Sequence, residues 1–316
     1  MDVRKEQEAL RVGVVGVGYL GQFHADKYAH MDGVDLVAVV DKNWERAQTI
    51  AAKTGTKAFQ RAEDIYSLVD AVSVVVPTLS HHEVAKGFLE RGIDVLVEKP
   101  ITDSLWQATE LVRHAKRKNC ILQVGHLERF NSVWRAIGGV IDKPRFIEAH
   151  RLGPFQERGT DVDVILDLMI HDIDIILKFI RVPIRTIDSV GVPVLSSNVD
   201  IANARIHFSD GSVANLTASR VSIKRTRKIR FFQQDLYASV DYDSREIQVY
   251  QRSCNGQGIP EIMGRQEVVP PNDSLREELD AFVHSVRTRC PPEVDGKAGR
   301  QALNVALKIL RKIRTS

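Results

Sequence analysis

Glycines at a fixed spacing offer the first place where this sequence can do chemistry. A GxGxxG pattern directly follows a short apolar run and precedes a segment that can form a helix, which is the context the pattern requires. In that context the turn lets the backbone approach a pyrophosphate, and the helix N-terminus faces the phosphate charge. We therefore predict a dinucleotide site here. Its loop comprises Gly16, Gly18, Tyr19, Leu20 and Gly21.

An acidic residue indicates which dinucleotide binds. Asp41 ends the next apolar run, 20 residues after Gly21. A carboxylate at this position accepts hydrogen bonds from the ribose hydroxyls and repels a 2′-phosphate. Lys42 and Arg46 lie close by in the sequence and weaken that repulsion. The prediction is NAD, with NADP the weaker ligand. The alternative is a structural glycine turn followed by a surface aspartate.

A lysine stands at the end of a later apolar run. Glu98, Lys99 and Pro100 close the run 93–99, and open α/β folds bind their ligands at the carboxyl ends of parallel strands. Beside a nicotinamide ring, a lysine there is placed to take part in proton transfer. The alternative is a solvated lysine in front of a proline turn.

One strongly apolar segment carries several aspartates and a histidine. On a continuous helix, Asp163, Asp167, His171 and Asp174 fall within an arc of about 80°, and Asp172 points the opposite way. Asp167 and His171 are four residues apart and so are neighbours on one face. A carboxylate beside an imidazole fixes its tautomer and raises its basicity, which suits a general base. The alternative is a buried pair whose members satisfy only each other.

The elements that must position these residues change in character near residue 126. Before it, apolar runs with little polar alternation lie between segments long enough for helices. This pattern predicts a parallel sheet with right-handed helical crossovers, because its strands are covered on both faces. We expect strands at 11–16, 35–41, 71–76, 93–99 and 120–125, and helices at 19–34, 43–55, 80–91 and 103–118.

After residue 126 the runs alternate apolar with polar residues and are joined by turn signals such as Ser209-Asp210-Gly211. Such alternation predicts a mostly antiparallel open sheet with one less buried face. Helices are expected at 161–180, 273–289 and 297–314. The predicted fold class is therefore α/β. A Rossmann-type, doubly wound NAD-binding domain spans 1–125, and an α+β substrate-binding and oligomerisation domain spans 126–316.

Composition excludes several classes of protein. Hydrophobic residues at 43% and charged residues at 27% are ordinary globular values, which exclude wholesale disorder. Three widely spaced cysteines offer neither a disulfide framework nor a metal site. No apolar run approaches the ~18 residues of a membrane span, and the first nine residues lack the apolar core of a signal peptide. We expect a cytoplasmic protein without a membrane partner.

The charge balance does not favour a nucleic-acid partner. The net charge of +3 is too small to indicate one. The run 224–230 holds five basic residues in seven, but no aromatic stacking pattern accompanies it. Attraction of a diphosphate, or a solvated strand edge, explains this run better.

Taken together, the glycine loop, the Glu98-Lys99-Pro100 tripeptide and Asp167-x-x-x-His171 resemble the glucose–fructose oxidoreductase/inositol dehydrogenase/MocA family in order and spacing. The resemblance covers essentially the whole chain and agrees with the two predicted domains. It implies that Lys99 and His171 serve proton transfer during hydride exchange at a sugar carbon, while Asp167 orients the histidine. Either Lys99 or His171 can be the base.

Looser motifs narrow the branch. Many family members carry glycines just before the catalytic helix and one between its aspartate and histidine. At these positions this chain has Gly159-Thr160-Asp161-Val162-Asp163 and Met169. Together with the segments VGHLERFN (124–131) and RLGPF (151–155), these residues make the sequence similar to the branch of the family that oxidises the 3-hydroxyl of UDP-N-acetylglucosamine. That resemblance implies a partner aminotransferase that makes the 3-amino sugar of lipid A. The alternatives are a free-sugar or inositol dehydrogenase, an NAD-dependent glycosidase, and a non-catalytic NAD sensor.

The remaining candidate residues follow from position at strand ends. Thr78 could instead cap a helix, and Arg129 and Asn131 could have ordinary surface roles. The predicted cofactor contacts are Gly16, Gly18, Tyr19, Leu20, Gly21, Asp41, Lys42, Pro77, Thr78, His81, Glu98 and Lys99, and the predicted substrate contacts are His126, Arg129, Asn131 and His171. No metal site is predicted. Because a one-sided sheet leaves a face to cover, we expect a homodimer or homotetramer packed sheet to sheet.

Overall fold

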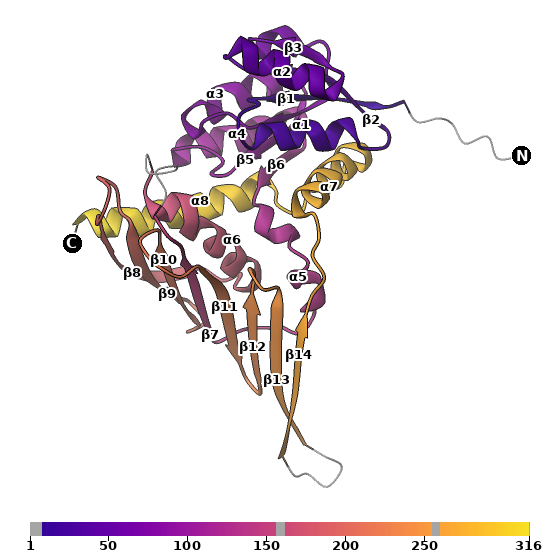
Figure 1. Cartoon of the computed structure of the whole chain (residues 1–316). Coiled ribbons are helices and arrows are strands. Elements are labelled where there is room, and N and C mark those ends of the chain that lie inside the picture. Colours follow the sequence, from indigo (N-terminus) through magenta and orange to yellow (C-terminus); the bar gives the residue numbers. More distant parts are fainter. Residues whose placement is uncertain (1–7, 156–161, 255–259, 316) are drawn as a thin grey trace, which may run out of the picture. The chain divides into compact units, whose positions relative to one another are not determined.

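The computed structural model (Figure 1) describes residues 8–155, 162–254 and 260–315. The chain divides into two compact units. The first unit comprises Met1–Leu127 with Leu275–Arg300, and the second comprises Glu128–Ser274 with Gln301–Ser316. Part of the motif at 159–163 lies outside the described residues. Within the described residues, no helix has the length and apolar character needed to cross a membrane.

The first unit is built on a parallel sheet of six strands in the order β3-β2-β1-β4-β5-β6. Its strands are β1 (Leu10–Val15), β2 (Val34–Val40), β3 (Lys57–Phe59), β4 (Ala71–Val74), β5 (Asp94–Glu98) and β6 (Leu122–Gly125). Its helices are α1 (Gly21–Ala29), α2 (Trp44–Thr54), α3 (Thr78–Leu89), α4 (Leu105–Lys118) and α7 (Ser274–Thr288). The predicted Rossmann-type sheet is confirmed, and β3 is a short strand that the sequence patterns did not indicate.

Strand order makes one end of this sheet suitable for a ligand. β1 pairs with β2 on one side and with β4 on the other, so the order of strands along the chain reverses at β1. Open α/β sheets bind ligands outside the carboxyl ends of their strands at such a reversal. The glycine loop follows β1, Asp41 follows β2, and Glu98 ends β5. These three sites therefore share one edge of the sheet.

The boundary between the units differs from the predicted division at 125/126. Helix α7 comes late in the chain, yet Leu279, Phe282 and Val283 on it pack in one core cluster with Val12 and Val14 of β1. The first unit is thus discontinuous in sequence. The apolar face of α7 is buried against the parallel sheet, a choice of partner that helical periodicity alone does not reveal.

The second unit is an eight-stranded sheet in the order β14-β13-β12-β11-β7-β10-β9-β8. The strands are β7 (Phe146–Leu152), β8 (Ile184–Val192), β9 (Ile201–Phe208), β10 (Val213–Ser219), β11 (Thr226–Gln233), β12 (Leu236–Asp241), β13 (Glu246–Cys254) and β14 (Pro260–Val268). All neighbouring pairs are antiparallel except β7 with β10. The predicted mostly antiparallel sheet is confirmed.

Helices cover one face of this sheet. They are α5 (Val133–Ala136), α6 (Ile170–Phe179) and α8 (Gly296–Thr315), which begins in the first unit and continues into the second. Inward residues of the strands, such as Ala204 and Phe231, join Ile173 of α6 and Ile309 of α8 in one buried cluster. Alternate residues of the strands face away from it, as the period of two requires.

The basic run 224–230 lies in and before β11, which pairs with β7 and β12 and so is not a sheet edge. Arg225 and Arg227 lie 3.0 and 3.8 Å from Asp243, and Arg230 pairs with Glu148. The three arginines of the run therefore pair with acidic side chains of the same sheet.

Candidate active site

Two glycines of the loop are required by its backbone turn, and the third leaves open space beside the backbone. Gly16 has φ +87°, and a Cβ there would lie 2.5 Å from the carbonyl oxygen of Val75. A Cβ on Gly21 would lie 1.8 Å from the carbonyl oxygen of Gly16. These two glycines are therefore required by the turn itself. Gly18 is different, because the nearest atom to its Cβ would be Nη1 of Arg46, 3.7 Å away. This open space fits the close backbone approach of a pyrophosphate.

Asp41 is held between this loop and the start of α2. Its Oδ2 accepts a hydrogen bond from the backbone N–H of Val17 (3.1 Å), and its Oδ1 accepts one from the N–H of Asn43 (2.8 Å). Arg46 reaches Oδ2 at 3.4 Å. The carboxylate is thus fixed beside the loop, where ribose hydroxyls can donate to its remaining lone pairs. Lys42, Tyr19 and Leu20 are exposed around it.

Glu98 does not face solvent. Its carboxylate lies over Gly125 of the neighbouring strand β6, where a Cβ would come within 2.9 Å of it. Its Oε1 lies 3.3 Å from Nε2 of His24, and its Oε2 accepts the backbone N–H of Lys99 at 3.2 Å. Burial opposes ionisation, but His24 and Lys99 hold the pKa of Glu98 below its ordinary value. Glu98 therefore orients the turn that carries the half-buried Lys99 rather than presenting its carboxylate outward.

His81 also departs from the predicted direct contact with the cofactor. Its side chain is 1% exposed, with Nδ1 2.9 Å from the carbonyl oxygen of Pro100 and Nε2 2.8 Å from that of Val76. Burial lowers the pKa of His81. The ring links the end of the β4 region to the turn after β5. Pro77 is the N-cap of α3 and Thr78 its first residue, and no side chain caps this helix.

The helix expected over 161–180 is not a continuous α-helix. Residues Ile165–Met169 form a π-helix, in which the N–H of Ile170 bonds to the carbonyl of Ile165, and α6 follows. The wider turn contains Asp167 and immediately precedes His171. Single π-turns inside helices occur often at functional sites. Asp167 and His171 are half-buried, whereas their acidic neighbours in this segment are buried.

The predicted polar stripe separates into residues with different surroundings. Asp174 forms a bidentate pair with Arg129, at 2.5 and 2.9 Å. Asp163 accepts the backbone N–H of Val199 at 2.9 Å. The structure therefore gives Asp163 and Asp174 structural roles in the fold, and the half-buried Asp167 and His171 stay the predicted candidates for chemistry. Asp172 belongs to another contact, as expected, because Arg151 binds both of its oxygens.

The predicted substrate contacts near residue 129 also have structural surroundings. The guanidinium of Arg129 is 8% exposed and committed to Asp174. Asn131 accepts the backbone N–H of Val133 at 3.2 Å, so it supports the local turn before α5. His126 is 1% exposed. The ordinary structural alternative therefore explains Arg129 and Asn131 better than contact with a phosphate.

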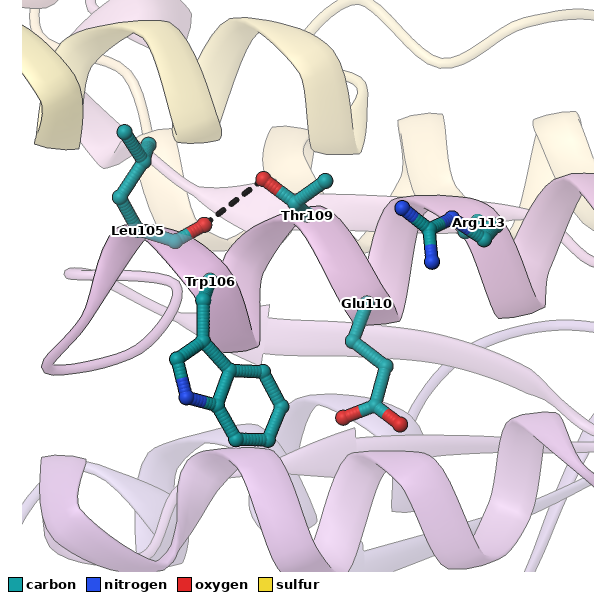
Figure 2. A pocket seen from close by; sticks show the side chains of 5 residues that line it. All are labelled: Leu105, Trp106, Thr109, Glu110 and Arg113. Atoms are coloured by element: carbon teal, nitrogen blue, oxygen red, sulfur yellow. Dashed lines mark hydrogen bonds between the residues drawn. The ribbon is translucent and has the colours of Figure 1, made fainter.

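A shallow pocket elsewhere on the first unit contains none of the predicted residues. It is lined by residues of α4, namely Leu105, Trp106, Thr109, Glu110 and Arg113 (Figure 2). Lys86 and His82 bind the carboxylate of Glu110 at 3.0 and 2.7 Å and lower its pKa to about 2. The carboxylate of Glu110 is thus already paired with basic side chains of the first unit.

Comparison with known proteins agrees with this geometry. The model of an oxidoreductase family with an NAD-binding Rossmann fold matches residues 10–126. The UDP-N-acetylglucosamine 3-dehydrogenase of Acidithiobacillus ferrooxidans is 37% identical over 302 residues, which cover 95% of this chain and 96% of that one. The chain belongs to the glucose–fructose oxidoreductase/inositol dehydrogenase/MocA family.

A solved structure and a second relative extend the comparison. A solved structure of the Acidithiobacillus enzyme superposes with a TM-score of 0.91 at 35% identity and covers 98% of this chain and 99% of its own. The scyllo-inositol 2-dehydrogenase (NAD(+)) of Bacillus subtilis is 29% identical over 243 residues, covering 68% of this chain and 69% of that one. As a member of this family, this chain is an NAD-dependent oxidoreductase that acts on a CH–OH group.

The fixed carboxylate of Asp41 makes a quantitative prediction for cofactor choice. NAD is expected to bind at least ~10-fold more tightly than NADP, a difference of about 1.4 kcal/mol. The reason is that a 2′-phosphate would meet the charge of Asp41. Calorimetric titration with both dinucleotides measures the ratio, and Asp41→Ser should reduce it. Equal affinities in the wild-type protein would mean that Arg46 or Lys42 accommodates the phosphate.

Proposed function

We propose that this enzyme oxidises the 3-hydroxyl of UDP-N-acetylglucosamine to a ketone with NAD. The observation that carries this proposal is similarity along the whole chain to an enzyme named for that reaction. Lys99, Asp167 and His171, each of which is half-buried, are the groups that such a reaction needs. The 3-keto product suits an aminotransferase, and we place the reaction in synthesis of the 3-amino sugar of lipid A.

In the proposed mechanism, one side chain of this protein accepts a proton and another stabilises the negative charge on the substrate oxygen. His171 accepts the proton of the substrate hydroxyl, and Asp167 fixes the tautomer of the imidazole. Lys99 stabilises the developing alkoxide oxygen by charge. The same reaction can run with the roles of Lys99 and His171 exchanged. NAD, when bound at the glycine loop, supplies the acceptor for the hydride, so the carbon is oxidised and NADH and a proton are formed.

A substrate screen tests the proposal directly. UDP-N-acetylglucosamine is expected to support NADH formation with a larger kcat/KM than UDP-glucose, N-acetylglucosamine, myo-inositol or scyllo-inositol. Mass spectrometry of the product after borodeuteride reduction locates the oxidised carbon. Preference for an inositol would replace the nucleotide sugar with the family's other substrate class. NAD binding without turnover of any of these compounds would favour an NAD sensor.

The face of the eight-stranded sheet opposite its helices supports the proposed assembly. Phe146, Phe232, Tyr237 and Tyr250 are direct cross-strand partners on β7, β11, β12 and β13, with ring centroids 5.2 to 6.1 Å apart. Their chain neighbours, such as Phe231 and Ala238, face the core. The aromatic row therefore lies on the opposite face. Contiguous apolar surface of this kind often marks an interface.

We accordingly expect a homodimer or homotetramer that buries the aromatic row. Light scattering at micromolar concentration should give a multiple of the chain mass. Tyr250→Asp should shift the mass downward, because a charge would be buried in the interface. Trp106→Asp, which changes an exposed aromatic residue of the first unit, is the matched control and should not. A monomeric wild-type protein would contradict this assembly.

A further inference from the structure

The start of the helix that carries Asp167 and His171 is not held by a capping side chain. Val164 occupies the N-cap position of the π-helix, and its side chain cannot accept a hydrogen bond. The N–H groups of Leu166 and Asp167 bond instead to the carbonyl oxygen of Asp163, at 3.0 and 3.1 Å. The position of Asp163 therefore determines where the turn containing Asp167 begins.

Asp163 and its neighbours are bound to the segment that leads into β9. Val199 donates its N–H to Oδ1 of Asp163 (2.9 Å), and its carbonyl oxygen accepts the N–H of Val164 (2.9 Å). Asp163 is 7% exposed, so these bonds are shielded from water. The beginning of the helix is thus bonded through both Asp163 and Val164 to one residue of a neighbouring loop.

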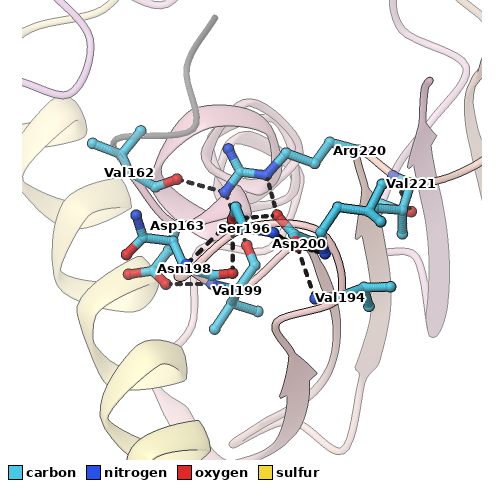
Figure 3. Close-up of polar contacts among 11 residues, drawn as sticks. Val162, Asp163, Val194, Ser196, Asn198, Val199, Asp200, Arg220 and Val221 are labelled. Atoms are coloured by element: carbon cyan, nitrogen blue, oxygen red, sulfur yellow. Dashed lines mark hydrogen bonds and ion pairs between the residues drawn. The ribbon is translucent and has the colours of Figure 1, made fainter. Parts of the chain in front are cut away.

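Arg220, the residue after β10, joins these two segments (Figure 3). Its Nη2 donates to the carbonyl oxygens of Val162 (2.6 Å) and Val199 (3.1 Å), and its Nε lies 3.0 Å from Oδ1 of Asp200. The side chain of Arg220 is buried. A guanidinium presents five N–H donors in a rigid planar fork, so one side chain can hold two carbonyls and a carboxylate at fixed angles.

Asp200 carries the negative charge that pairs with the buried guanidinium of Arg220. It is fully buried, and its Oδ2 accepts the backbone N–H groups of Val194, Leu195 and Ser196 at 2.6 to 2.8 Å. The hydroxyl of Ser196 donates to Oδ1 at 2.6 Å. Although burial opposes ionisation, these hydrogen bonds keep the pKa of Asp200 below its ordinary value. The anion is therefore retained inside the protein.

We propose that Arg220, held by Asp200, is a positioning residue that sets the direction of Asp167 and His171. This inference rests on the proposed function of those two residues. Arg220 bridges Val162, which directly precedes Asp163, and Val199, which binds the carboxylate of Asp163. The carbonyl of Asp163 in turn accepts the first hydrogen bonds of the π-helix. The contact acts at one remove from the chemistry, so loss of Arg220 misplaces the base without removing it.

The test compares Arg220→Gln and Arg220→Lys with Arg314→Met. Arg314 also approaches Asp163, at 3.3 Å, but its side chain is 66% exposed and its contact is with the carboxylate. Arg220→Gln should lower kcat by ~10²-fold, since misplacement by about 1 Å costs that much, with KM for NAD unchanged. Arg220→Lys, which keeps the charge beside Asp200, should lose less. Arg314→Met should behave as wild type.

A readout independent of turnover keeps the inference separable from the proposed function. NMR of ¹³C-labelled histidine follows the titration of His171, whose signal among the ten histidines is identified by its loss in His171→Asn. Arg220→Gln and Arg220→Lys should shift that titration, and Arg314→Met should not. An unchanged titration in both Arg220 variants, with unchanged kcat, would overturn the inference. If the wild-type protein oxidises no sugar but the titration shifts, the positioning role stands and the proposed function fails.

Discussion

Replacing His171 with alanine, or Lys99 with methionine, is expected to lower kcat by ~10²–10⁴-fold, the usual range for removing general acid–base help. The affinity for NAD should be unchanged, because the phosphates and the ribose are expected to bind at the glycine loop and Asp41, whose geometry does not depend on these side chains. Steady-state kinetics with UDP-N-acetylglucosamine and calorimetry with NAD measure the two quantities separately.

The control for this prediction is His284→Ala. His284 is an exposed histidine of α7, and its backbone carbonyl, not its side chain, accepts the hydrogen bond from Thr288. Its replacement should change neither kcat nor NAD affinity. A fully active His171→Ala enzyme would rule out the imidazole as a participant. If Lys99→Met alone kept normal turnover, the alkoxide would have to be stabilised by another group.

Two aspartates five residues apart should respond in opposite ways to the same change. Asp172 is 3% exposed and accepts two hydrogen bonds from Arg151, at 3.0 and 2.9 Å. Asp172→Asn removes one of the two anionic partners that the buried guanidinium of Arg151 has among the described residues, and Glu128 is the other. Because breaking a buried ion pair typically costs 3–5 kcal/mol, we expect a loss of about 3 kcal/mol in the free energy of unfolding and a lower Tm.

Asp167→Asn should instead act on the rate. Asp167 is half-buried, and its proposed role is to orient His171. We expect a small change in Tm, a lower kcat and a displaced pH–rate profile, since the imidazole loses its negatively charged neighbour. Melting temperature, kcat and the pH profile of both variants decide the matter. A large loss of stability in both would favour a purely structural role for the whole segment.

The first unit was largely predictable because its signals are local. A glycine turn, an apolar strand and a helix start are each determined by residues close in sequence, so Gly16, Gly18, Gly21 and Asp41 could be assigned from residue type and spacing alone. Strands buried on both faces have continuous apolar runs, which indicated the parallel sheet. The one-faced alternation of the second unit indicated its antiparallel sheet by the same reasoning.

The inward placement of His81 and Glu98 required the tertiary structure. Position at a strand end indicates the correct edge of the sheet, but it does not say whether a side chain points out toward a ligand or back toward the turn. His81 turns back to Pro100, and Glu98 fits over Gly125 because that residue has no Cβ. Each arrangement depends on a contact with a segment that is distant in the sequence, and the residue pattern of one segment does not show such a contact.

Partner choice across long separations also came only from the fold. Gln123 bonds to the backbone of Glu278, which draws α7 into the first unit from 155 residues away. Arg129 selects Asp174, and Arg220 selects Asp200, from a chain with 44 basic and 41 acidic side chains. Periodicity indicates which face of an element is apolar, not which element covers it.

The π-helix shows the same limit within one segment. The residue types predicted a helix with Asp167 and His171 on one side, and those two residues remain the candidates for chemistry. The backbone hydrogen bond from Ile170 to Ile165 spans five residues. A pattern of apolar residues analysed at 3.6 residues per turn does not reveal such a spacing. The sequence determined which groups are available for proton transfer. The tertiary structure decided where the turn that carries them begins, because Asp163 and Val164 at its start are bonded to Val199, a residue far away in the sequence.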